Sequence, residues 1–302
     1  GSQSCKSSSN SNFWAFKDAN DYLICQGSQV CNNNWLVQNL GGACCSGDQV
    51  CNGIAQFHFS TQTVFSGEAA TCKRDVCCDG NEVCHGTSET SGPPTTEFIN
   101  VNTLSCRGEK TCAQMKANIK KNLFCSGNSD VSPTGQGTCK GSSNRFTFDA
   151  QSGNTHCVTC KSTGRTKGDT CGDSTYDFQT PAGKVKMTCE GTGFASGICV
   201  SAKINLADAG SCMELQCIAG TDTCKDLQFT GSGTCHCTGD SSLCPSQCPY
   251  SASANPCGFE SDPCADPAAC CADDSVIMPA IPNCGSASCG CTPPGSITSN
   301  TA

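Results

Sequence analysis

The chain repeats one seven-residue motif four times, as Cys25-Gln-Gly-Ser-Gln-Val-Cys31, Cys45-Ser-Gly-Asp-Gln-Val-Cys51, Cys78-Asp-Gly-Asn-Glu-Val-Cys84 and Cys106-Arg-Gly-Glu-Lys-Thr-Cys112. Each copy reads C-x-G-x-x-[VT]-C. Looser copies with one more residue between the cysteines span 217–224 and 237–244, and truncated C-x-G starts occur at Cys125, Cys139 and Cys189. A motif that returns every few tens of residues is typical of repeat architectures, in which each repeat is one structural unit.

The segments between the motifs alternate apolar and polar residues, as in Phe57-His-Phe59 and Tyr176-Asp-Phe178. Short alternating runs bounded by Gly, Asn, Ser and Asp predict half-buried β-strands. The alternation often continues into a cysteine: Cys189 has the same phase as Val185 and Met187, so its sulfur should point inward, and the same holds for Cys217. One stretch, 113–123, has a pattern that is also compatible with a helix.

Each repeat therefore consists of a strand, a C-x-G turn, a cysteine and a second short strand. The motifs begin at residues 25, 45, 78, 106 and 125, spacings of 20, 33, 28 and 19 residues. These spacings suit one turn of a β-solenoid with loop insertions. The predicted fold is all-β, a disulfide-stapled solenoid resembling a parallel β-helix, with an irregular Cys/Pro-rich C-terminal region. A string of small independent cysteine-rich modules is the rival, but such modules hold about six cysteines in roughly 40 residues and few extended runs.

Three regions are predicted along the chain. Residues 1–24 hold a concentration of aromatic side chains and are expected to form an N-terminal cap. Residues 25–244 form the repeats. Residues 245–302 are rich in Pro and Cys and almost free of alternation, which indicates a separate cap or arm held by disulfides.

The cysteine content implies an oxidising environment. The chain has 33 cysteines in 302 residues, above the level that marks a disulfide scaffold, so we expect an extracellular location, secreted or on a cell-surface appendage. Each exact motif should close its own bridge, since its glycine can adopt a positive φ that brings the two ends within reach. We therefore expect the disulfides Cys25–Cys31, Cys45–Cys51, Cys78–Cys84 and Cys106–Cys112. Bridges between adjacent coils are the alternative, because coils stack about 4.8 Å apart.

Charge and composition exclude several classes of partner. A net charge of −8 argues against nucleic acid and anionic membrane surfaces. No apolar run approaches the length of a membrane span, so membrane insertion is not expected. The sequence lacks an N-x-[ST] site, so any glycan on this chain would be O-linked.

The ionisable residues form no recognisable catalytic group. Asp173 with Asp177, or Asp208 with Glu214, could supply a pair of carboxylates for glycoside hydrolysis, but 26 acidic residues make some such pairs inevitable. The Gly-Asp-Ser triplets at 172–174 and 239–241 are better explained as turns than as nucleophile loops. The single C-x2-C pair, 157–160, lacks the second pair that a zinc site needs. The acidic residues of the tail, Glu260, Asp262, Asp266, Asp273 and Asp274, follow no calcium-loop pattern. We expect a protein that is not an enzyme and has no cofactor or metal site.

The C-x-G-x-x-[VT]-C units joined by alternating strands resemble the cysteine-rich solenoid repeats of secreted protist and algal proteins, including subunits of extracellular filaments such as mastigonemes. The resemblance covers residues 25–244 and is strongest in the four exact copies. It implies an assembly subunit without an active site.

The sequence thus predicts a non-catalytic structural subunit that self-associates into an extracellular filament or surface layer. The segment Val276-Ile-Met-Pro-Ala-Ile-Pro282 is a strongly apolar run in a polar tail, as expected of an interface. Its prolines suit an edge or extended arm. We expect an assembly interface formed by Phe13, Trp14, Val276, Ile277, Met278 and Ile281. A secreted carbohydrate-binding protein or polysaccharide-active β-helix enzyme is the second hypothesis, which aromatic and acidic side chains along one face would favour.

Overall fold

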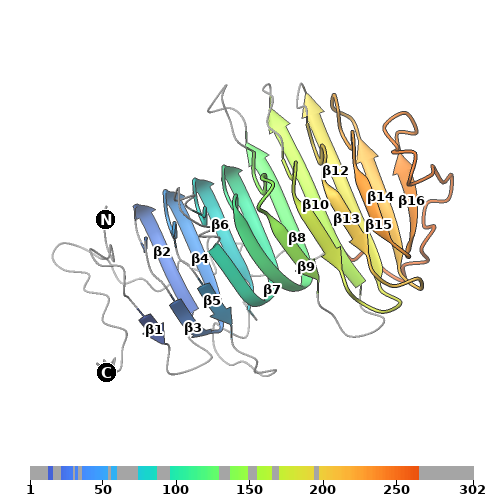
Figure 1. Ribbon diagram of the computed structural model, residues 1–302. Coiled ribbons are helices and arrows are strands. Elements are labelled where there is room, and N and C mark those ends of the chain that lie inside the picture. The colour runs from blue at the N-terminus through green and yellow to red at the C-terminus, as the bar shows by residue number, and fades with distance from the viewer. Residues whose placement is uncertain are drawn as a thin grey trace.

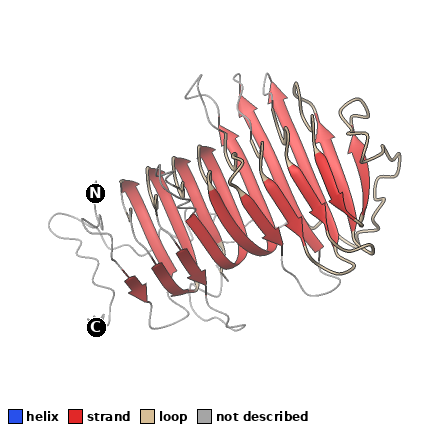
Figure 2. Ribbon diagram, viewed as in Figure 1, coloured by secondary structure: helices blue, strands red, loops and turns tan. Residues whose placement is uncertain are grey.

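The computed structural model describes residues 13–15, 22–29, 31–32, 36–53, 56–59, 74–86, 96–128, 137–148, 155–164, 170–193 and 197–264. These residues form an open β-solenoid of parallel strands, and they contain no helix (Figures 1 and 2). The predicted fold class, an all-β solenoid with many disulfides, is confirmed.

The strands lie in two layers, which we call the short-strand face and the long-strand face (Figure 1). The short-strand face contains β1 (Phe13–Ala15), β3 (Leu36–Leu40), β5 (Gln56–Phe59), β9 (Arg145–Phe148), β11 (Thr175–Phe178), β13 (Lys203–Leu206) and β15 (Gln228–Gly231). The long-strand face contains β2 (Tyr22–Ser28), β4 (Gly42–Asp48), β6 (Val76–Asn81), β10 (Thr155–Gly164), β12 (Lys184–Gly193), β14 (Cys212–Ile218) and β16 (Thr234–Gly239). Two longer strands, β7 (Thr96–Glu109) and β8 (Met115–Asn128), pair with strands of both faces.

One strand from each face makes a coil, and β7 and β8 each make a coil alone. We number the coils 1 to 9 from β1 and β2 to β15 and β16. The stretch 113–123, which is also compatible with a helix, lies largely within β8. Met115, Ala117 and Ile119 are buried at alternate positions there, because parallel pairing with β7 and β9 supplies a core for one side of a strand.

The first cysteines of the motifs stack in register on the long-strand face. The aligned row, which we call the opening cysteines, is Cys25, Cys45, Cys78, Cys106, Cys125, Cys160, Cys189 and Cys217. All of them are buried, which confirms the inward orientation expected for Cys189 and Cys217. Each is bonded to a closing cysteine of its own coil, in order Cys31, Cys51, Cys84, Cys112, Cys139, Cys171, Cys199 and Cys224. The four pairings expected from the exact motif are therefore present.

The closing cysteines share a rare backbone conformation. Their φ angles lie between 53° and 62°, the left-handed region that non-glycine residues seldom occupy. In this conformation the amide of each closing cysteine points along the solenoid axis. The amide of Cys84 donates to the carbonyl of Val50 in the preceding coil at 3.0 Å, and that of Cys112 donates to Val83 at 3.0 Å. The same bond recurs at Cys139, Cys171, Cys199 and Cys224. The turn thus supplies a third column of hydrogen bonds beside the two faces.

Aromatic rings fill the space between the two faces. Phe57 stacks on Phe98 with ring centroids 4.6 Å apart, and Phe148 stacks on Phe178 at 4.5 Å. Stacked rings in adjacent coils follow from the parallel register, which places equivalent side chains above one another. All four rings are buried in the core.

The motif glycine has no room for a side chain. In Gly80, with φ of +130°, a Cβ would lie 1.9 Å from the carbonyl oxygen of Gly47 in the preceding coil. We therefore predict that Gly80→Ala lowers the free energy of unfolding by about 3 kcal/mol or more, since a left-handed strain of about 1–2 kcal/mol adds to the cost of overpacking. Denaturant unfolding followed by circular dichroism measures this.

Gly141→Ala is the matched control, because Gly141 has φ of +140° but the nearest atom to its added Cβ is 3.8 Å away. It should cost only the backbone strain of about 1–2 kcal/mol. Equal losses in the two variants would mean that close contact between coils does not explain the motif glycine.

Candidate functional site

The most elaborate feature outside the core is the segment 245–264, which we call the arm. It leaves the last coil and runs back over the long-strand face toward the N-terminus (Figure 1). Three disulfides tie it to three coils: Cys248 to Cys235 in coil 9, Cys257 to Cys212 in coil 8, and Cys264 to Cys157 in coil 6. The arm therefore spans four coils and is covalently attached at both ends and in the middle.

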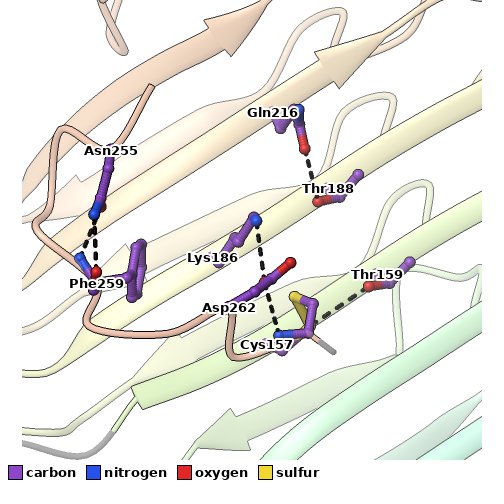
Figure 3. Close-up of polar contacts among 9 residues, drawn as sticks. Cys157, Thr159, Lys186, Thr188, Gln216, Asn255, Phe259 and Asp262 are labelled. Carbon is purple, nitrogen blue, oxygen red and sulfur yellow. Dashed lines mark hydrogen bonds and ion pairs between the residues drawn. A yellow bond between two sulfur atoms is a disulfide. The ribbon is translucent and has the colours of Figure 1, made fainter. Parts of the chain in front are cut away.

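Polar contacts attach the arm to coil 7 between these disulfides. The ammonium of Lys184 donates to the carbonyl of Gly258 at 2.5 Å. That of Lys186 is 3.1 Å from Asp262 Oδ1 (Figure 3). Within the arm, Asn255 Nδ2 donates to the carbonyl of Phe259 at 2.9 Å, and its Oδ1 accepts the amide of Phe259 at 2.7 Å. The side chain of Asn255 thus holds the bend from which the arm continues to Asp262.

Glu214 lies on the face that the arm covers. It is the register partner of Lys186 on the next coil, and only 5% of the residue is exposed. Burial raises the pKa of the Glu214 carboxyl, an effect that Lys186 opposes and Asp262 reinforces. The pKa of Asp262 is lowered, chiefly because the backbone N–H of Cys264 donates to its carboxylate. Glu214 and Asp262 both interact electrostatically with Lys186. The arm is therefore attached to the long-strand face by charge as well as by disulfides.

The pair Cys157 and Cys160 shows why C-x2-C is not a metal motif here. Both residues lie on β10, three positions apart, so their side chains leave opposite sides of the strand. Cys160 points inward and bonds to Cys171, whereas Cys157 points toward the arm and bonds to Cys264. Sequence reasoning missed Cys160 as an opening cysteine, because Ser162 replaces the motif glycine there.

One cysteine of the repeat pattern was assigned wrongly. The C-x-G at Cys139 is not the start of a repeat: Cys139 is the closing cysteine of Cys125, fourteen residues earlier. The larger sequence separation between Cys125 and Cys139 makes the motif hard to recognise. The φ of Cys139, 53°, matches that of the other closing cysteines, so its structural role is preserved although the spacing is not.

The stacked disulfides bring sulfur atoms together without creating a metal site. The sulfurs of Cys25, Cys45 and Cys51 lie within 4.8 Å of one another, as do those of Cys106, Cys125 and Cys139. Every one of these sulfurs is in a disulfide, whereas metal binding requires thiolates.

We predict that a chelator leaves the circular dichroism and the melting temperature of the protein unchanged. A reductant combined with mild denaturant should abolish the folded spectrum, because it removes the loop constraints of roughly 2–4 kcal/mol each. Loss of structure on chelation alone would contradict the assignment of these cysteines to structural disulfides.

In each candidate carboxylate pair, one aspartate, Asp177 or Asp208, makes structural contacts. Asp173 is exposed in a turn, whereas Asp177 is 4% exposed and accepts hydrogen bonds from Arg145 at 2.6 Å and from Asn205 at 3.4 Å. Asp208 is partly exposed, and one of its oxygens accepts the amides of Ala182 and Gly210. In both cases the carboxylate stabilises a turn or a neighbouring strand.

The serine of the first Gly-Asp-Ser triplet is also structural. Ser174 is buried, and its hydroxyl donates to the carbonyl of Cys139 in the preceding coil at 2.6 Å. Of the acidic residues in the tail, Glu260 and Asp262 belong to the arm, while Asp266, Asp273 and Asp274 lie outside the described residues.

His156 is a buried titratable group within the core. Its Nε2 is 2.9 Å from the hydroxyl of Thr180, and its Nδ1 is 3.2 Å from the carbonyl of Lys121. Burial lowers the pKa of His156 from 6.5 to about 4, although the backbone contact opposes this shift. The imidazole is therefore neutral at neutral pH.

This burial predicts an acid-sensitive fold. Below pH 6.5 the unfolded chain binds a proton at His156, and the folded chain does not until about pH 4, so stability falls as the pH is lowered through this window. Lowering the pH from 7 to 5 should cost about 2 kcal/mol through this residue. Denaturant unfolding at both pH values measures the loss. His156→Gln should remove this part of the pH dependence; an unchanged pH dependence in the variant would refute the assignment.

Comparison with protein-family models, with curated proteins and with solved structures found no match. The expected resemblance to filament subunits is therefore supported by no relative. The side chains of Phe13 and Trp14 and all of 276–281 lie outside the described residues, and of the predicted cap 1–24 the structure describes only 13–15 and 22–24. Among the described residues, no helix could span a membrane.

Proposed function

We propose that this protein is a non-catalytic structural subunit of an extracellular filament or surface assembly, formed by self-association. The observation that carries the proposal is the column of eight buried disulfides, to which the arm adds cross-links to coils 6, 8 and 9. Such a scaffold gains stability from covalent links in addition to its apolar core, which suits a durable component of an oxidising environment.

The hydrogen bonds made by potentially reactive side chains support a structural role. Asp177, Asp208, Ser174 and His156 are each engaged in hydrogen bonds that hold turns or adjacent coils together. Arrangements for catalysis would instead direct such groups toward a shared accessible point. We therefore interpret these residues as parts of the scaffold.

The distribution of aromatic side chains gives no support to the polysaccharide alternative. Sugar-binding faces use exposed aromatic rings. In the described coils the rings of Phe57, Phe146 and Tyr176 are fully buried, and Phe124 and Phe229 are partly buried. Among the described residues, the exposed large apolar residue is Tyr250, which is 52% exposed. It lies in the arm and not in a row along a face.

The position of Cys264 bears on how copies would join. Its disulfide to Cys157 fixes residue 264 over coil 6, on the side of the solenoid and not at its end. The following tail begins there, and its apolar run starts at Val276, twelve residues later. A tail that starts on the side favours lateral or staggered contact with a neighbouring copy, in which its apolar run packs near Phe13 and Trp14.

The double substitution Ile277→Asp and Ile281→Asp tests this proposal. We expect the native protein to form higher assemblies, seen as fibres or layers under negative stain and as large species by light scattering. The variant should fold with an unchanged circular dichroism spectrum and remain a monomer, because two charges cannot be buried in an apolar interface.

Ser286→Asp with Ser288→Asp is the matched control, since it adds the same charge to the same tail outside the apolar run. It should assemble like the native chain. A native protein that stays monomeric under all extracellular conditions would refute the proposed function, and assembly by the isoleucine variant would refute this interface.

A further inference from the structure

A solenoid ends in open strand edges, and this one ends with an edge that its own arm covers. In a parallel stack every coil offers unpaired N–H and C=O groups to the next, so the last coil can pair with any strand that fits. In the part of the chain that the structure describes, coil 9 is the last coil, formed by β15 and β16. The contacts on its outer edge therefore decide whether the stack stops there.

The arm closes the edge of β16 with backbone hydrogen bonds. The amide of Cys237 donates to the carbonyl of Pro249 at 2.9 Å, and the carbonyl of Cys237 accepts the amide of Ser251 at 2.7 Å. These two bonds form an isolated parallel bridge between Cys237 and Tyr250. At this bridge Tyr250 of the arm takes the place of one residue of a tenth coil. Beyond the bridge the arm forms no further strand pairing with β16 among the described residues.

A side chain of the arm closes the edge of β15. The amide of Phe229 donates to Oε1 of Gln247 at 2.9 Å. Gln247 supplies an acceptor where the next coil would supply a carbonyl, and it offers no strand to extend. The disulfide Cys235–Cys248 holds this part of the arm against coil 9.

The opposite end of the stack has the complementary geometry. Within the described part of the chain, β1 pairs only with β3 and β2 only with β4, so each has a partner on one side. Coil 1 of a second copy would continue the parallel register of coil 9. Such contact is heterologous and does not close, so it would produce an open-ended filament of coaxially stacked chains.

We infer that the arm is a built-in terminator: it keeps the C-terminal edge of coil 9 from pairing with coil 1 of a second copy, and releasing it permits coaxial head-to-tail growth. The terminator acts through the outer edge of coil 9, whereas the assembly proposed above uses the tail that follows Cys264. Both involve coil 1 of a second copy, and they are separated by testing the terminator in a chain whose tail contacts are removed. The two ideas are independent, and each can fail without the other.

The test releases the arm from the solenoid in the full-length chain while the eight ladder disulfides stay in place. Cys157, Cys212, Cys235, Cys248, Cys257 and Cys264 are replaced by serine, and Gln247 by alanine, all in a background carrying Ile277→Asp and Ile281→Asp so that tail contacts do not contribute. We expect the parent to keep a fixed mass by light scattering at every concentration. The released variant should elongate into fibres whose diffraction shows a repeat of about 4.8 Å along the fibre axis.

A blocked variant, which is the released variant without one hydrogen-bond donor on the outer edge of β16, shows whether elongation occurs at that edge. Cys235 has the same parity as Cys237 on β16, so its amide faces the same open edge. Cys235→Pro, used instead of Cys235→Ser, removes that donor and should prevent elongation. A released variant that folds and never elongates, or a blocked one that elongates equally, would overturn the inference.

Hydrogen exchange on the native protein covers the case in which the released variant does not fold. The amides of Cys237 and Phe229 should be protected as strongly as strand amides of the preceding coil, and Gln247→Ala should abolish protection at Phe229 alone. Free exchange of both amides in the native chain would show that the arm leaves the edge open, contrary to the inference.

Discussion

The turn that closes each coil is the constraint on which the rest of the structure depends. A disulfide joins the opening and closing cysteines, and the closing cysteine adopts a left-handed conformation that directs its amide to the coil before it. The motif glycine lets the backbones of adjacent coils approach more closely than any side chain would allow. Because the same turn recurs in coils 1 to 8, it fixes the register, and the register in turn stacks the sulfurs and rings of the core.

The same strand geometry explains why the chain needs an arm. Opening cysteines point inward, so a cysteine three residues earlier on the same strand points outward and can pair only with chain that passes over the face. Cys157 is such a residue, and Cys264 of the arm meets it. Cys212, five residues before Cys217, likewise meets Cys257. The outward cysteines thus define the path of the arm, along which Lys184, Lys186 and Glu214 of the covered face are arranged.

Much of the fold could be predicted from the sequence because its signals are local. The C-x-G motif and period-two alternation identified the solenoid, the four exact bridges and the inward direction of Cys189 and Cys217. Signals that depend on distant residues could not be read. Cys160 has a serine at the glycine position, Cys139 lies fourteen residues after Cys125, and the partner of Cys157, Cys264, lies 107 residues away. The arm was foreseen as irregular and disulfide-held, but only the structure shows which coils it crosses and which strand edges it covers.

Disulfide mapping of the non-reduced native protein tests the central claim most directly, namely that each coil closes on itself. Fragments generated at low pH, where disulfides do not exchange, are assigned by tandem mass spectrometry that cleaves S–S bonds. The account predicts that Cys45 is linked to Cys51 and Cys78 to Cys84, together with the long-range pair Cys157–Cys264. Linkage between neighbouring coils, such as Cys31 to Cys51, would contradict it, because the closing turns could not then take the conformation on which the stack depends.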